Sequence, residues 1–186
     1  MRKLTALLML LASSTVAETT NFEIDGNLAP TRNPGCVALR DARSDLSPPD
    51  IALGIRQCII DQEWRKAADL LYLMNIRGRF DSLRVVDKTA HQAFQVLNLQ
   101  LGQSLWKPQQ DALMPLVDQL TSKGTPARNA FCAEMRRQGP PVHDPTWMIN
   151  HGMGAFTGIE GDGLVPGFNA LRAWNDILNN EIECPL

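Results

Sequence analysis

Histidines and nearby acids are the side chains of this sequence that come closest to a hydrolytic site. His143, His151, Glu160 and Asp162 offer the nitrogen and oxygen ligands that transition metals accept. Their spacing matches no established ligand motif, including the EF-hand calcium loop. A small, metal-dependent hydrolase that uses these residues is therefore an alternative interpretation. The main expectation is that the chain is not an enzyme and needs no cofactor or metal.

One further pair of residues, Asp87 and His91, has both a chemical and a structural interpretation. Asp87 and His91 would lie one turn apart on a helix, where the carboxylate could orient the imidazole for acid–base chemistry. A local stabilising contact is the more common role of such a pair, and we expect that role here. The serine hydrolase motif G-x-S-x-G and the zinc peptidase motif H-E-x-x-H are both absent.

Basic residues gather near a predicted helix junction and could bind an acidic partner or a phosphate. They surround Phe80, which has the character of a core residue, and they are Arg77, Arg79 and Arg84. This patch is one candidate docking surface.

Four cysteines, Cys36, Cys58, Cys132 and Cys184, form no C-x-x-C pair, so neither a redox dithiol nor a zinc knuckle is expected. An even number is typical of disulfides in an oxidising compartment, and four cysteines allow three connectivities. We favour Cys36–Cys58 with Cys132–Cys184, because each bond would tie an irregular terminal segment to a predicted helix.

The segment from Asn150 to Phe168 contains six glycines between two predicted helices. Its glycines match neither the phosphate-binding G-x-x-x-x-G-K-[ST] motif nor a G-x-G-x-x-G that follows a strand. A mobile loop with a few apolar anchors suits partner recognition, in which a small number of buried residues supply most of the binding energy. A flexible surface crossing without a role is the alternative. The predicted partner-binding residues are Met153, Phe156, Ile159, Glu160, Asp162 and Leu164.

The first residues have the pattern of a secretory signal peptide. Arg2 and Lys3 precede an apolar stretch from Leu4 to Ala12, and small residues lead to Ala17. The stretch is shorter than the roughly 20 residues that span a bilayer. We therefore expect residues 1–17 to be removed, no membrane anchor to remain, and the protein to be secreted across the inner membrane into the periplasm.

Charge argues against nucleic acid as a partner. The chain carries 18 basic and 20 acidic residues, and removal of residues 1–17 takes away two of the basic ones. The remaining chain is mildly acidic and has no basic run, whereas nucleic acids and anionic membranes attract basic surfaces.

The sequence after the signal peptide predicts an irregular N-terminal arm over residues 18–46 and a helical domain over residues 47–186. Prolines follow cap residues at Ser47, Thr125 and Asp144, which marks helix starts. Gly78 is expected to end the second helix and Pro115 to kink or interrupt the fourth. Apolar residues at helical spacing indicate helices over about 48–60, 63–75, 81–101, 108–122, 126–138, 145–152 and 167–180.

Because no stretch alternates as a strand does, the predicted fold is all-α. We expect a single disulfide-stabilised domain of six or seven amphipathic helices with helical-hairpin packing. The first two helices should form an antiparallel hairpin. This hairpin is similar to tetratricopeptide or Sel1-like units, so a helical scaffold is a second alternative, although no constant repeat follows.

One stretch, Asn75-Ile-Arg-Gly-Arg-Phe-Asp81 followed by residues 84–93, resembles a family of known proteins when taken with Cys36, Cys58 and the hairpin between them. Over about residues 36–100 the chain resembles periplasmic immunity proteins that accompany type VI secretion phospholipase effectors. The resemblance implies a non-enzymatic inhibitor that binds a secreted toxin and blocks its active site or substrate entrance. It transfers no binding residues, because the matching stretch belongs to the scaffold.

Overall fold

The computed structural model describes residues 24–185, so the predicted signal peptide lies outside the described residues. Within them the chain forms eight helices and no strand beyond a single antiparallel bridge between Val85 and Leu164, which confirms the all-α prediction. None of these helices is long and apolar enough to cross a membrane. The helices are α1 (Pro48–Ile60), α2 (Trp64–Arg84), α3 (Gln92–Gln103), α4 (Lys107–Thr121), α5 (Pro126–Gln138), α6 (Thr146–Ile149), α7 (Gly154–Thr157) and α8 (Ala170–Asp176).

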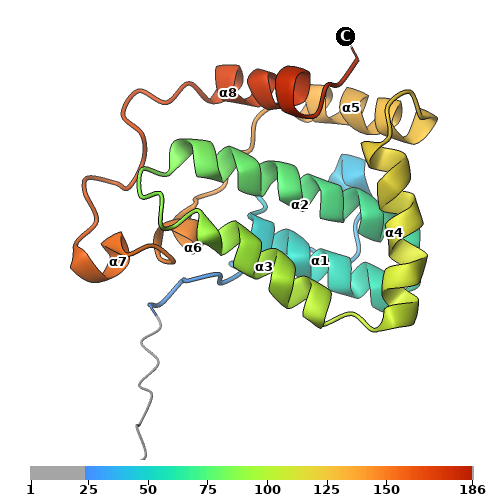
Figure 1. Cartoon of the computed structure of the whole chain (residues 1–186), viewed down its shortest axis with the longest axis horizontal. Helices are drawn as coiled ribbons and strands as arrows, with labels where there is room; N and C mark the ends of the chain where they lie inside the picture. The colour runs from blue at the N-terminus through green and yellow to red at the C-terminus, as the bar shows by residue number, and fades with distance from the viewer. Residues whose placement is uncertain (1–23, 186) are drawn as a thin grey trace, which may run out of the picture.

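A hairpin of α1 and α2 forms the centre of the molecule (Figure 1). Ser47 caps α1 as predicted: its hydroxyl accepts the Asp50 amide proton, and the Asp50 carboxylate accepts that of Ser47. Three polar residues, Asp61 to Glu63, connect the helices, and apolar side chains such as Ile55 and Leu73 are fully buried. The predicted hairpin is confirmed.

Helix α2 is longer than the sequence predicts, and the next helix is correspondingly shorter. Gly78 does not end α2, which continues to Arg84, and α3 begins only at Gln92 rather than near Asp81. Gly78 instead lies directly against Phe94 of α3, since a Cβ atom there would lie 2.4 Å from Cδ2 of Phe94. The glycine therefore permits helix packing, and the expectation of a helix end at this residue is wrong.

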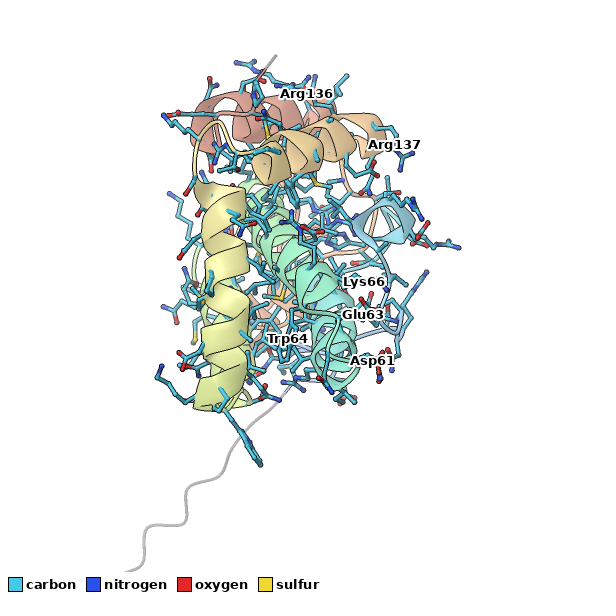
Figure 2. The ribbon with its side chains drawn as sticks, turned by 90° about the vertical axis from the view of Figure 1, so that its right-hand side faces the viewer. Asp61, Glu63, Trp64, Lys66, Arg136 and Arg137 are labelled. Carbon is cyan, nitrogen blue, oxygen red and sulfur yellow. A yellow bond between two sulfur atoms is a disulfide. The ribbon has the colours of Figure 1, made fainter. Side chains whose placement is uncertain are left out.

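The remaining helices cover this hairpin without repeating it. In Figure 1, α4 crosses the ends of α2 and α3, and α5 and α8 form a second layer along the other side of α2. Helix α4 continues through Pro115, and α5 begins at Pro126 behind the predicted cap, Thr125. Figure 2 shows Arg136 and Arg137 of α5 at the opposite end of the molecule from the α1–α2 turn with Asp61 and Glu63.

Both disulfides connect the cysteines as predicted. Cys36 bonds Cys58 of α1, and Cys132 of α5 bonds Cys184 near the C-terminus. Two disulfides in a chain of this size are typical of an oxidising, non-cytoplasmic compartment.

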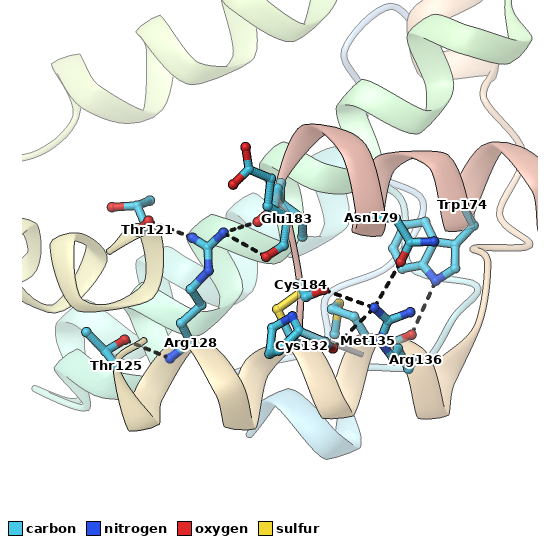
Figure 3. The surroundings of a disulfide bond; sticks show 12 residues. Thr121, Thr125, Arg128, Cys132, Met135, Arg136, Trp174, Asn179, Glu183 and Cys184 are labelled. Atoms are coloured by element: carbon cyan, nitrogen blue, oxygen red, sulfur yellow. Dashed lines mark hydrogen bonds between the residues drawn. A yellow bond between two sulfur atoms is a disulfide. The ribbon is translucent and has the colours of Figure 1, made fainter. Parts of the chain in front are cut away.

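Arginines of α5 reinforce the second disulfide (Figure 3). Arg128 donates hydrogen bonds to the backbone oxygens of Thr121 and Ile182, and Arg136 donates to the oxygen of Cys184 at 3.2 Å. Helix α8 ends in a π-helical turn, Ile177–Glu181, before this contact. The C-terminal segment is thus fixed to α5 by one covalent bond and several charge-assisted hydrogen bonds.

The N-terminal arm packs closely on the helices from residue 24 onward. The Asp50 carboxylate accepts the backbone amide protons of Thr31 at 2.7 Å and Arg32 at 2.9 Å. The amide of Leu28 donates to the carbonyl of Trp147 at 3.0 Å. Within residues 24–46 the arm contains one 3-10 helix, Leu39–Asp41, and the acid that caps α1 also holds the arm in place.

Candidate functional site

The glycine-rich segment, residues 150–168, is attached to the connection between α2 and α3. Its first attachment is Asp87, whose Oδ2 accepts the Gly154 amide proton at 2.8 Å, while the Thr89 hydroxyl accepts that of Met153 at 2.8 Å. A Cβ atom on Gly152 would lie 2.4 Å from Asp87 Oδ2, so only glycine allows this approach. The segment is therefore fixed at this end, which differs from the mobile loop predicted from the sequence.

A second attachment lies ten residues further along the segment. The Val86 amide donates to the Gly163 carbonyl at 3.0 Å, and the Val165 amide donates to the Arg84 carbonyl at 2.8 Å. These bonds form the bridge that pairs Val85 with Leu164. Between the two attachments the chain forms the single-turn helix α7, which the sequence did not predict.

The predicted partner-binding residues divide into exposed and half-buried ones. The apolar side chains of Met153, Phe156 and Ile159 are exposed, as are those of Glu160 and Asp162. Leu164, the sixth of these residues, is half-buried and packs against the core. A hollow of about 220 Å³ lies beneath the segment, and its lining includes Val86, Asp87, Ile149, Ile159 and Glu160.

Acidic side chains lie on the glycine-rich segment and at its first attachment. Hydrogen bonds from the Thr89 hydroxyl and then the Gly154 amide hold the pKa of Asp87 below its usual value. Neither Glu160 nor Asp162 forms an ion pair with any described residue. We call the exposed residues of this segment, Met153, Phe156, Ile159, Glu160 and Asp162, the loop face; they combine exposed apolar groups with negative charge that no ion pair among the described residues neutralises.

The residues of the predicted hydrolase do not assemble into one site. His143 is buried beside Asp81, whereas His151 Nδ1 bonds Asn27 Oδ1 at 2.8 Å. Glu160 and Asp162 line two different hollows. Within residues 24–185 no group of three or more histidines, cysteines and acids is placed to hold a metal ion.

The predicted pairing of Asp87 with His91 is wrong, because these residues precede α3 rather than lying on a helix together. Asp87 bonds Thr89 and Gly154, and the His91 Nε2 atom lies 3.0 Å from the Val85 carbonyl oxygen. Through these hydrogen bonds both side chains hold the backbone of the connection between α2 and α3 in place.

A buried polar network around Asp81 was not predicted. Its carboxylate, which is fully buried, accepts hydrogen bonds from His143 Nε2 at 2.8 Å, Trp147 Nε1 at 2.7 Å and Arg84 Nε at 2.9 Å. The Nδ1 atom of His143 is buried without a partner among the described residues. The network therefore joins α2 to α6 and to the segment that precedes α6.

The basic patch around Phe80 is also not formed. Arg77 is only 2 % exposed and donates from Nη1 to the carbonyl oxygens of Arg43 and Leu46 at 2.8 and 2.7 Å. Arg84 binds Asp81, and Arg79 pairs with Glu181 at 2.7 Å. Phe80 is fully buried, as its apolar character indicated.

One groove was missed by the sequence reasoning. It has a volume of about 560 Å³ and lies between α2, α3 and α4; its lining consists of Leu71, Asn98, Leu99, Leu101, Gly102, Gln103, Leu105, Gln110, Leu113 and Met114. The sequence of α3 could have indicated this groove, because none of its twelve residues carries a charged side chain. We call this hollow the α3–α4 groove.

The sequence also contains one S-x-x-K spacing, Ser104 to Lys107, which belongs to no catalytic arrangement. The Ser104 hydroxyl donates to the Leu101 carbonyl at 2.7 Å, as in a helix end, and the Lys107 ammonium pairs with Asp111.

Fold and site together define an all-α, disulfide-bonded domain with an exposed loop face. The chain matches no protein-family model, no curated protein and no solved structure.

Proposed function

We propose that the protein is an exported inhibitor, an immunity protein that binds a secreted antibacterial effector such as a phospholipase and blocks it. In this role the loop face contacts the effector. The observation that carries the proposal is the combination of exposed Met153, Phe156 and Ile159 with two firm attachments of the segment that presents them.

Preorganisation gives this arrangement its physical advantage. A segment that is already ordered loses little conformational entropy on association, so more of the contact energy appears as affinity. Phenylalanine and methionine are enriched in the centres of protein interfaces, where a few side chains supply most of the binding energy. The unpaired Glu160 and Asp162 favour a basic surface around the effector's entrance, because complementary charge accelerates association.

The signal-peptide pattern and the disulfides support export, and the resemblance over residues 36–100 supports the immunity role. An effector that acts in the periplasm would meet its inhibitor there.

Co-purification tests the proposal. The proposal predicts that a gene beside that of this chain encodes the effector. The chain, expressed with its signal peptide and a C-terminal tag, is recovered from the periplasm of cells that also produce the product of that neighbouring gene. We expect a stoichiometric complex that the double substitution Phe156→Gln with Ile159→Gln disrupts. Leu171→Gln, at an exposed site on α8, is the matched control and should retain the complex. Absence of a complex, or a complex that survives the double substitution, contradicts the proposal.

A further inference from the structure

The hollow beneath the glycine-rich segment is built by the two attachments of that segment, and we call it the loop hollow. Its volume is about 220 Å³, and its lining includes both partners of each attachment: Asp87 with Gly154, and Val86 with Gly163. The Asp87 carboxylate accepts the Gly154 amide proton at 2.8 Å. The Val86 amide donates to the Gly163 carbonyl at 3.0 Å. Because these hydrogen bonds form within the chain itself, the loop hollow exists before any partner binds.

Apolar side chains form the walls of the loop hollow. Four of its nine lining residues carry them: Val85, Val86, Ile149 and Ile159. The two isoleucines meet at Gly163, where a Cβ atom would lie 3.1 Å from Ile149 and 3.3 Å from Ile159. Three lining residues are glycines, which contribute no side chain to fill the space between the walls. The loop hollow therefore offers hydrocarbon contact to an inserted chain.

The charged part of the lining is negative. It consists of the carboxylates of Asp87 and Glu160, and no lining residue is a cation. The donors to Asp87 are the Thr89 hydroxyl and backbone amides, which are neutral and so favour its charge without cancelling it. Glu160 is exposed, and neither it nor Lys88, the cation next to Asp87 in sequence, forms an ion pair with any described residue. Two negative charges thus remain for a partner to neutralise.

Apolar walls combined with carboxylates are the complement of a basic side chain. Lysine and arginine have an apolar stem that packs on hydrocarbon and a cationic end that binds carboxylates. A neutral apolar side chain in the loop hollow would remove water from the carboxylates without supplying a partner, which is unfavourable. Its volume lies below the roughly 300 to 1,000 Å³ of small-molecule sites, so it suits one side chain of a larger partner.

We propose that the loop hollow receives one basic side chain, a lysine or an arginine, of the effector. The stem of this side chain packs against Ile149 and Ile159, and the charges of Asp87 and Glu160 hold its cationic end. This inference rests on the proposed function, because it names the group of the effector that the loop face recognises.

A titration with small probes, followed by nuclear magnetic resonance, tests the loop hollow without the effector. The probes are N-acetyl-lysine methylamide, its arginine equivalent and its norleucine equivalent, which keeps an apolar stem but has no charge. We expect the better basic probe to bind with a dissociation constant of about 1 to 10 mM and to shift the amide signals of Gly154, Gly158 and Gly163. The norleucine probe should bind at least tenfold more weakly. Basic probes that bind no better than norleucine overturn the inference.

Glu160→Gln and Asp162→Asn form a matched pair of variants. Each removes one negative charge from an exposed side chain of the loop face, but only Glu160 lines the loop hollow. We expect Glu160→Gln to raise the dissociation constant of the basic probe at least threefold and Asp162→Asn to leave it unchanged. Thermal unfolding of both variants should match the wild type, because both side chains are exposed. Equal effects of the two substitutions on probe binding overturn the inference.

The effector separates this inference from the proposed function. Glu160→Gln should weaken the complex at least tenfold, and Asp162→Asn by no more than about threefold. A complex that tolerates Glu160→Gln but is disrupted by the double substitution of Phe156 and Ile159 overturns this inference and leaves the proposed function intact. Absence of any complex overturns the proposed function and the assignment to an effector, whereas the probe titration still decides whether the loop hollow selects a basic side chain.

Discussion

Arg77 illustrates how a residue that looks functional in sequence can be structural. Its guanidinium lies inside the molecule and donates to carbonyl oxygens of the segment that precedes α1. Burial lowers its pKa to about 10, so the group stays charged at neutral pH. The charge persists because several backbone dipoles solvate it in place of water.

Substitution of this arginine should therefore affect stability. We expect Arg77→Met to lower the free energy of unfolding by about 3 kcal/mol, because buried carbonyl oxygens lose their donors. Arg79→Met is the matched control, since Arg79 is exposed and its ion pair with Glu181 contributes at most about 1 kcal/mol. Urea unfolding of both variants measures the difference. Equal losses would contradict the structural role of Arg77.

Asp87 makes attachment of the glycine-rich segment dependent on pH. Its folded-state pKa lies below its unfolded value of about 3.9, because hydrogen bonds from Thr89 and Gly154 favour the carboxylate. The stabilisation is thus complete above the unfolded pKa and disappears as pH falls below about 4 through the folded pKa.

Comparison with Asp87→Asn isolates this contribution. At pH 7 we expect the wild type to be more stable by about 1 kcal/mol, the net contribution of an ordinary intramolecular hydrogen bond. The difference should shrink between pH 4 and pH 2, as urea unfolding at a series of pH values would show. A difference that stays constant over this range would show that the charge of Asp87 is not what holds the segment.

At the scale of elements, Gly78 fixes how closely α2 and α3 approach. Gly78→Ala adds helix propensity worth about 1 kcal/mol but places a methyl group against the Phe94 ring. We expect the steric cost to exceed the gain, with a net loss of about 1 to 2 kcal/mol. Gly102→Ala, at a position in α3 with open space around it, should instead stabilise by up to about 1 kcal/mol. Thermal unfolding of both variants should give shifts of opposite sign, and shifts of the same sign would contradict this packing.

The same glycine shows what the sequence could predict about the elements. Helix starts could be predicted where a side chain caps the helix and a proline follows. Ser47 and Thr125 are such residues, and the hydroxyl of each accepts a backbone amide proton of the helix it begins. Gly78 carries the local signal of a helix end, but its role depends on Phe94, which is distant in sequence. The attachment of Gly163 to Val86 likewise depends on a contact that no local pattern records.

For the site, composition identified the glycine-rich segment but could not show how it is held. Exposed Phe156 and Ile159 agree with the prediction, whereas Leu164 is drawn inward by its pairing with Val85. The α3–α4 groove was missed because its lining comes from three helices, and each contributes residues that look like ordinary amphipathic positions.

At the scale of the whole molecule, the disulfides tie both described ends of the chain to helices. They close loops with sequence separations of 22 and 52 residues. In the chain-entropy model, each should contribute about 3 to 4 kcal/mol, with the larger share from Cys132–Cys184. We expect Cys132→Ala with Cys184→Ala to destabilise at least as much as Cys36→Ala with Cys58→Ala. Urea unfolding of both pairs would measure this, and a negligible loss in either would contradict it.

The central claim, that the protein inhibits a secreted effector through its loop face, is tested most directly by an inhibition titration. The effector identified by co-purification is purified and assayed with increasing amounts of the wild type and of the Phe156→Gln, Ile159→Gln variant. We predict complete loss of effector activity at one equivalent of wild type and about 100-fold weaker inhibition by the variant. Full effector activity in excess wild type, or equal inhibition by the variant, would contradict the account.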